Sequence, residues 1–281
     1  MTSEHLMQHR ALTGQRRSGV VTLMIAFAAV VVCSAQSACE FNRKPGFVTP
    51  ATLESPYNAH RSADRTVTVW AVAPMRNESG TSTVDPMRVS DALVAQLQQV
   101  RGIQVLSLNR TMAVMRTIGL TTIESQADAT KLAKELGVDA IVAGTITAYD
   151  PYEPVQFGLA LALLAPNGSP IVGDSDPNQT VDPVALQAAG TDFGLSIGGG
   201  ALSGPLSVVA MHYDGANHDV QQSVHHFAQG RSDSVTAMGW EQYLASMRLF
   251  TTYACYDATA RLLYQEQQRL TGAQRAAVQE E

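Results

Sequence analysis

The stretch "SQADATKLAKELGVDAIVAGTITAYD", residues 125–150, carries the clearest structural signal in this sequence. Ser125 and Asp128 have the spacing of a capping box, which marks the first turn of a helix. Gly137 ends a helical pattern whose apolar positions are Ala129, Leu132, Ala133 and Leu136. The apolar run 138–149 follows directly and has the composition of a buried strand. The stretch therefore predicts a helix followed by a core strand.

Further strands and helices are expected on both sides of this pair. The run 66–74 is apolar on both faces, and Asp85-Pro86 supplies an N-cap with proline at the first helical position. Further strands are expected at 103–107, 154–166 and 205–214, and further helices at 86–99, 108–120, 217–231 and 238–270. The order β-α-β-α-α-β-β-β-α-α predicts an α/β fold, a three-layer-like sandwich of one mixed β-sheet packed by helices, with a long C-terminal helix.

Along 154–166, large side chains alternate with small ones, as in a strand with one core face. The predicted core positions are Val155, Phe157, Leu159, Leu161 and Leu163.

The N-terminal segment is expected to be an export signal. Three arginines precede the apolar run 19–32, which is too short to span a ~30 Å hydrocarbon core that needs about 20 residues. Ser37-Ala38-Cys39 resembles a bacterial lipobox, in which the cysteine is acylated, although Gln36 stands where an apolar residue is usual. We predict a signal over 1–38 and lipid attachment at Cys39. The alternatives are cleavage near Ala35 or Ala38 without acylation, or an uncleaved anchor.

Downstream of Cys39 the chain divides into three further parts. Residues 39–65 lack sustained periodicity and are predicted to be a flexible tether. An α/β domain is expected over 66–270, with a Gly- and Pro-rich flexible insertion at 167–204 and a frayed tail at 271–281.

Charge and cysteine content narrow the classes of function. The whole chain has a net charge of -6, and removing 1–38 removes three positive charges and one negative charge, which gives -6 - (3 - 1) = -8. Nucleic-acid binding is therefore not expected. Without Cys33 and Cys39, only Cys255 remains as a thiol, so no disulfide framework is expected. Cys255 lies in an apolar helical pattern, which predicts a packed side chain.

Familiar catalytic and metal-binding motifs are absent from the sequence. It contains no P-loop, His-Glu-x-x-His, Cys-x-x-Cys or Gly-x-Ser-x-Gly motif, so we expect neither an enzyme nor a cofactor. The first ligands of a calcium-binding loop have the spacing of Asp174, Asp176 and Asn178. The loop's glycine and bidentate glutamate are replaced by Gln179 and Ala185, so a calcium site is not expected. Four histidines cluster over fifteen residues and are expected to be solvated: His212, His218, His225 and His226.

Eight positions within residues 66–165 follow a shared pattern of strand ends, helix end and core strand: Pro74, Asn77, Arg110, Glu135, Leu136, Gly137, Asp139 and Gly144. With these positions, the region resembles the curli-secretion (CsgG-like) lipoprotein superfamily. Its relatives include lipoproteins that activate penicillin-binding proteins and the amino-terminal domain of the Tol translocation protein. The resemblance implies an envelope protein that docks on a synthase or joins a secretion assembly. The chain departs from the pattern in its insertion at 167–204, and it lacks the paired amphipathic strands that a pore would need.

The segment "YDPYEP", residues 149–154, follows the central strand. One interpretation is a rigid turn between strands. The other is a partner-contact patch formed by Tyr149, Asp150, Tyr152 and Glu153, because tyrosine is frequent at interfaces.

Together these features predict a periplasm-facing lipoprotein, with the outer membrane as the favoured address, that acts as a non-enzymatic adaptor or regulatory component. Its partners would be the membrane, through Cys39, and an envelope protein. A solute-binding protein whose loops at 74–86 and 149–154 form a pocket, or a homo-oligomeric secretion-channel component, are the alternatives.

Overall fold

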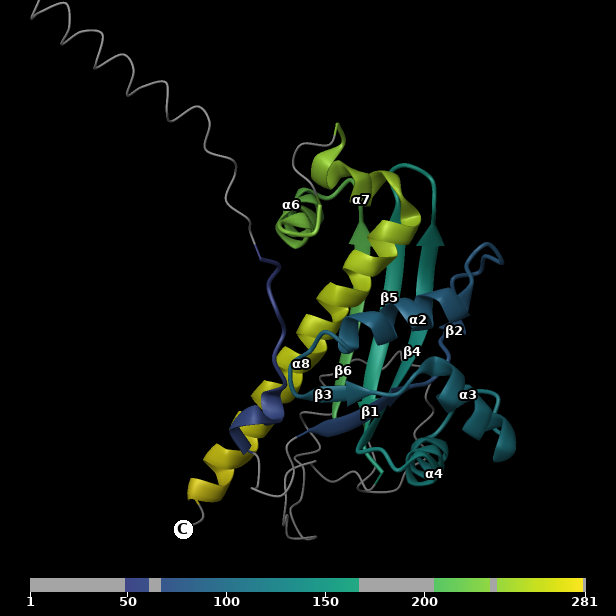
Figure 1. The fold of residues 1–281 in the computed structure, drawn as a ribbon, viewed down its shortest axis with the longest axis vertical. Helices are drawn as coiled ribbons and strands as arrows, with labels where there is room; N and C mark the ends of the chain where they lie inside the picture. The colour runs from purple at the N-terminus through teal and green to yellow at the C-terminus, as the bar shows by residue number, and fades with distance from the viewer. Residues whose placement is uncertain (1–48, 61–66, 167–204, 233–236, 280–281) are drawn as a thin grey trace, which may run out of the picture. The chain divides into compact units, whose positions relative to one another are not determined.

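The structure, a computed structural model, describes residues 49–60, 67–166, 205–232 and 237–279 (Figure 1). The predicted signal 1–38, Cys39 and the predicted insertion 167–204, including its calcium-like stretch, lie outside the described residues. No helix in the described ranges combines the length and apolarity needed to cross a membrane.

Six strands form one mixed sheet. They are β1 (Thr68–Val72), β2 (Arg76–Asn77), β3 (Ile103–Val105), β4 (Ala140–Asp150), β5 (Gln156–Leu164) and β6 (Ser207–Asp214). Their order is β3-β1-β4-β5-β6, and β2 pairs with β4 beyond the end of β1. The strands β3, β1 and β4 are parallel, whereas β4, β5 and β6 are antiparallel neighbours. The sequence did not predict β2, because two residues are too few to form a pattern.

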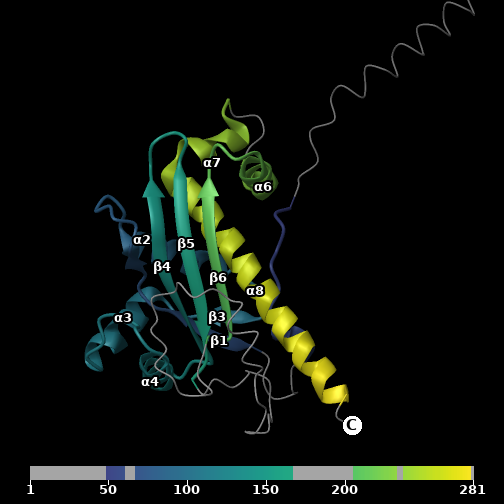
Figure 2. The same cartoon turned by 180° about the vertical axis from the view of Figure 1, so that it is seen from behind.

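Helices pack on both faces of this sheet. They are α2 (Pro86–Leu97), α3 (Leu108–Thr117), α4 (Gln126–Leu136), α6 (His218–Ala228), α7 (Gln242–Ala245) and α8 (Met247–Gln279), with 3-10 helices η2 (Pro56–His60) and η3 (Gly239–Glu241). On one face, α2 and α8 share a core with Trp70 and Phe157. On the other, α4 and Met115 of α3 share a core with Ala71 and Ile141. Neighbouring strand residues point to opposite faces. The predicted α/β fold with its long C-terminal helix is confirmed (Figures 1 and 2).

Local signals explain the helix before β4. The Ser125 hydroxyl accepts a hydrogen bond from the Asp128 N–H at 3.2 Å, and the Asp128 carboxylate accepts one from the Ser125 N–H at 3.0 Å. Gly137 follows with φ +67°, a left-handed conformation that glycine adopts without steric cost. The predicted capping box and helix stop are therefore confirmed.

The strand β5 is buried on both faces. The five core positions predicted along 154–166 are all at most 2 % exposed; Val155 lies just before β5, and the other four lie in it: Phe157, Leu159, Leu161 and Leu163. The opposite face is also buried and consists of small residues over most of its length, including Ala160 and Ala162. The small side chains on this face allow the elements that cover it to pack close to the strand.

Gly158 of β5 allows close contact with β4. A Cβ at this position would lie 2.3 Å from the Thr147 hydroxyl oxygen and 2.7 Å from the Ala148 backbone nitrogen. We expect Gly158→Ala to lower the free energy of unfolding by about 1–3 kcal/mol, because backbone cannot move aside as a side chain can. Urea denaturation measures this change. In the control, Gly272→Ala on α8, the added Cβ has no atom within 4 Å; equal losses in both variants would contradict the explanation.

The C-terminal helix differs from its predicted start. The sequence predicts one helix over 238–270, but Ser246 has extended backbone angles and separates α7 from α8. The bend places the Tyr243 ring edge-on against Phe227 of α6, with ring centroids 5.4 Å apart. Tertiary packing therefore overrides the helical periodicity. The helix α8 continues through Gln279, past residue 271, where a frayed tail was predicted.

Residues 49–60, called the strap below, pack against the α/β domain. The Ser55 N–H donates to the Arg101 carbonyl, and the Arg101 N–H donates to the Leu53 carbonyl, both at 2.9 Å. Tyr57 is 2 % exposed, and its ring meets Trp70 edge-on with centroids 6.3 Å apart. The structure thus differs from the predicted tether over these residues, because a buried aromatic side chain and a backbone bridge hold them in place.

A buried carboxylate fixes the strap to the rest of the domain. Glu266 of α8 is fully buried and accepts hydrogen bonds from the Tyr57 hydroxyl at 2.6 Å and the Ser207 hydroxyl at 2.8 Å. The Arg269 guanidinium donates to both carboxylate oxygens, at 2.8 and 2.5 Å. Burial, followed by the negative charge of Glu266, raises the pKa of Tyr57. This Glu266 cluster joins the strap, β6 and α8.

Candidate functional site

The β4–β5 turn (residues 150–155) is fixed at both ends. Asp150 pairs with Gln156 in the ladder, and the Asp150 carboxylate accepts a hydrogen bond from the Tyr152 N–H at 3.0 Å. On the other side, Val155 is 2 % exposed, and its carbonyl accepts a hydrogen bond from the Gly215 N–H at 2.8 Å. These contacts hold the apex of the turn in one position relative to the sheet.

The four residues of the predicted patch are divided between surface and interior. Tyr152 is 79 % exposed, and Asp150 and Glu153 are exposed beside it. Tyr149 is half-buried, and its ring packs edge-on against Phe157 at 6.3 Å between centroids. Desolvation raises the pKa of Tyr149. The surface of the turn is therefore one tyrosine between two carboxylates, and its role as a partner contact stays a prediction.

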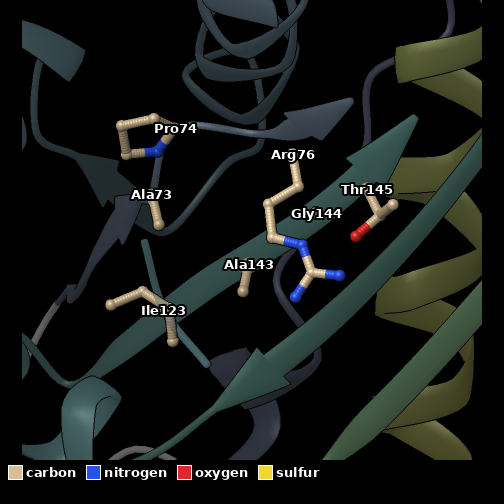
Figure 3. Close-up of a pocket in the computed structure, with 7 residues that line it drawn as sticks. All are labelled: Ala73, Pro74, Arg76, Ile123, Ala143, Gly144 and Thr145. Atoms are coloured by element: carbon tan, nitrogen blue, oxygen red, sulfur yellow. The ribbon is translucent and has the colours of Figure 1, made fainter. Parts of the chain in front are cut away.

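A groove lies at the carboxyl end of β1, where the chain passes to β2. Its volume is about 490 Å³, and it is lined by Pro74, Met75, Arg76, Asn77, Glu78, Met87, Thr121, Thr122 and Glu124. Figure 3 shows the Arg76 side chain extending over β4 beside Thr145. Both residues line a small pocket of about 10 Å³ next to the groove. Because β1 lies between β3 and β4, this edge is a topological switch point, where open α/β sheets commonly bind ligands.

The polar groups of the groove already have partners in its own loops. Arg76 forms an ion pair with Glu78, and the Asn77 amide donates to the Thr81 carbonyl at 2.6 Å. The Thr122 hydroxyl donates to Glu124 at 3.1 Å. A solute site needs a few polar groups that converge on the ligand. These three pairs engage polar side chains of the groove with its own loops, so they give no support to the alternative of a solute-binding pocket.

The histidines named in the sequence do not gather into a metal site. His225 packs edge-on against Trp240 with centroids 5.5 Å apart, whereas His212 lies on β6. Across the described ranges, no three His, Cys, Asp or Glu side chains are placed to share a metal ion.

Cys255 is a fully buried residue of α8, as its sequence pattern predicts. Burial raises the pKa of its thiol to about 12. In a chain beginning at Thr49, where it is the single cysteine, we expect no reaction with a thiol reagent at pH 8 until the protein unfolds. Absorbance after addition of an aromatic disulfide measures the reaction; rapid labelling of the folded protein would contradict the burial.

Comparisons with known proteins give distant structural likenesses only. No protein-family model matches the chain, and no curated protein matches it. Among solved structures, lipoprotein GNA1162 from Neisseria meningitidis is 17% identical, with 43% of this chain and 91% of that chain covered and a TM-score of 0.31. The LpoB C-terminal domain from Salmonella enterica is 14% identical, with 39% and 81% covered and a TM-score of 0.30.

The hypothetical protein CT253 from Chlamydia trachomatis is 11% identical, with 73% of this chain and 96% of that chain covered and a TM-score of 0.33. All three TM-scores are below 0.5, so these likenesses carry no argument about function. The resemblance to the CsgG-like superfamily stays a prediction.

The sequence predicted the turn but assigned Tyr149 to it, whereas Tyr149 belongs to β4. The strap was not predicted. The signal for the turn was a pair of prolines beside tyrosines after a strand. Arg76 and Glu78 of the groove lie in a polar loop with no pattern of their own.

Proposed function

We propose that this protein is an exported bacterial lipoprotein that acts as a non-enzymatic adaptor. Acyl chains on Cys39 hold it to the membrane, and the β4–β5 turn docks on a protein partner. The observation that carries the docking proposal is Tyr152, which is 79 % exposed at the apex of a turn that is fixed at both ends.

An exposed tyrosine on a fixed turn is suited to docking. Its ring can bury a large apolar area while its hydroxyl keeps a hydrogen bond, and tyrosine is enriched among the residues that dominate interface energies. The turn is already ordered, so binding costs little backbone entropy. Because Asp150 and Glu153 flank the ring, we expect the partner to offer an apolar pocket with basic residues at its rim.

The acylated Cys39 would attach the domain to the membrane, which is the second part of the proposed function. Two or more acyl chains hold a protein stably to a bilayer, whereas a single chain binds marginally. An acylated Cys39 would keep the domain on the periplasmic side of its membrane and would raise its effective concentration near partners there.

Chemical cross-linking in the native envelope tests the docking surface. We expect wild type to form a discrete adduct, and Tyr152→Ala to lower its yield about tenfold or more, as loss of a central interface residue does. Tyr264→Ala is the matched control, because Tyr264 is a tyrosine 61 % exposed on α8. Loss of the adduct in the Tyr264 variant, with retention in the Tyr152 variant, would contradict the proposal.

A further inference from the structure

The strap fixes the place where the chain from the anchor reaches the domain. The Arg231 guanidinium donates to the Ala51 carbonyl at 3.3 Å and to the Phe227 carbonyl at 2.9 Å. The same guanidinium lies over the rings of Phe227 and Tyr256, at 4.4 and 4.8 Å from their centroids. Arg231 is thus held by four contacts, and the start of the strap is held by Arg231.

This place lies at the same end of the domain as the β4–β5 turn. Gly215, which bonds Val155 of the turn, is followed by α6, and Arg231 comes just after α6. An eleven-residue helix is about 16 Å long, and this one helix connects the two places along the chain. Figures 1 and 2 show α6 and α7 at the end where β4 turns into β5, with α4 at the opposite end.

The chain between anchor and strap is short. Eleven residues separate Cys39 from Ala51. Whatever their conformation, twelve steps of about 3.5 Å span at most about 42 Å. A flexible chain of this length has a root-mean-square span of about 20 Å. With Cys39 in the bilayer, the start of the strap therefore stays within about 42 Å of the bilayer.

We infer that the α6 end of the domain faces the membrane and that the partner of the β4–β5 turn is an integral membrane protein of the same bilayer, contacted close to the membrane surface. This inference rests on the proposed function, because it needs the acylated Cys39 and the docking turn. The inferred orientation excludes a partner in the opposite membrane. It also excludes a partner that contacts the α4 end of the domain.

Energy transfer to the membrane tests the orientation. A donor dye is attached to the full acylated chain at Tyr152→Cys or, at the opposite end, at Glu135→Cys on α4; Cys255 is buried and stays unlabelled. The protein is placed in phospholipid vesicles that carry an acceptor dye at the surface. We expect a larger loss of donor intensity at position 152 than at position 135. An equal loss, or a larger loss at 135, would overturn the inference.

A lengthened chain is the control for the anchor. Inserting about 30 Gly and Ser residues after Val48 raises the root-mean-square span to about 35 Å, so the difference between the two dye positions is expected to shrink. A difference unchanged by the insertion would contradict a role for the short chain. The mass of each sample confirms acylation beforehand. An unacylated chain, or a Tyr152→Ala variant with normal adducts, would instead refute the proposed function.

Discussion

Removing the strap is expected to cost the domain a large part of its free energy of unfolding. A chain that begins at Val67 lacks Tyr57, which uncovers Trp70 and leaves Glu266 without one of its donors. Loss of a large buried aromatic side chain costs about 3–5 kcal/mol. Loss of one hydrogen bond to the charged Glu266, which keeps Ser207 and Arg269 as donors, adds about 1.5–3 kcal/mol. These losses approach the whole stability of a typical domain, about 5–15 kcal/mol.

Urea denaturation followed by circular dichroism measures this effect, with a chain beginning at Thr49 as the control. Tyr57→Phe separates the two contributions, because it keeps the ring and removes the hydroxyl. Its expected loss is about 1.5–3 kcal/mol, the range for a hydrogen bond to a charged group. Equal denaturation midpoints for the chains beginning at Thr49 and Val67 would show that the strap is a passive tether after all.

Replacing the anchoring cysteine is expected to abolish stable membrane attachment. In a bacterial host, wild type is predicted to appear in the membrane fraction with a mass that starts at Cys39 and includes acyl groups. Cys39→Ser removes the thiol that would carry the diacylglycerol, so the variant is expected to remain unprocessed. Intact mass spectrometry of both proteins measures this difference. A soluble wild-type product cut at another residue would contradict the lipoprotein proposal.

The parts of the fold that the sequence predicts are those determined locally. Ser125, Asp128 and Gly137 lie within thirteen residues of one another, and their side chains and backbone act on the helix that contains them. The alternation along β5 likewise depends on neighbours in the chain. Such local preferences predict the structure correctly because tertiary packing favours the same conformation.

The parts that the sequence missed depend on contacts between distant segments. Tyr57 and Glu266 are 209 residues apart, and nothing near Tyr57 distinguishes it from a residue of a flexible tether. The break at Ser246 similarly follows from the contact of Tyr243 with α6. Local periodicity cannot report either contact.

The candidate site was predictable in position more than in detail. The prolines of "YDPYEP" indicate a turn after a strand, and the turn is present. Which tyrosine faces solvent depends on the last residues of β4: Tyr149 still belongs to the strand and packs on Phe157, whereas Tyr152 lies beyond it.

The most direct measurement is photo-cross-linking in living cells with a photoreactive phenylalanine analogue in place of Tyr152 and, separately, in place of Tyr264. The adaptor proposal predicts a discrete adduct with an envelope protein from position 152 and none from position 264, and it predicts loss of that adduct when Cys39→Ser is added. An adduct from position 264 alone, or no adduct from position 152 in the membrane-attached protein, would contradict it.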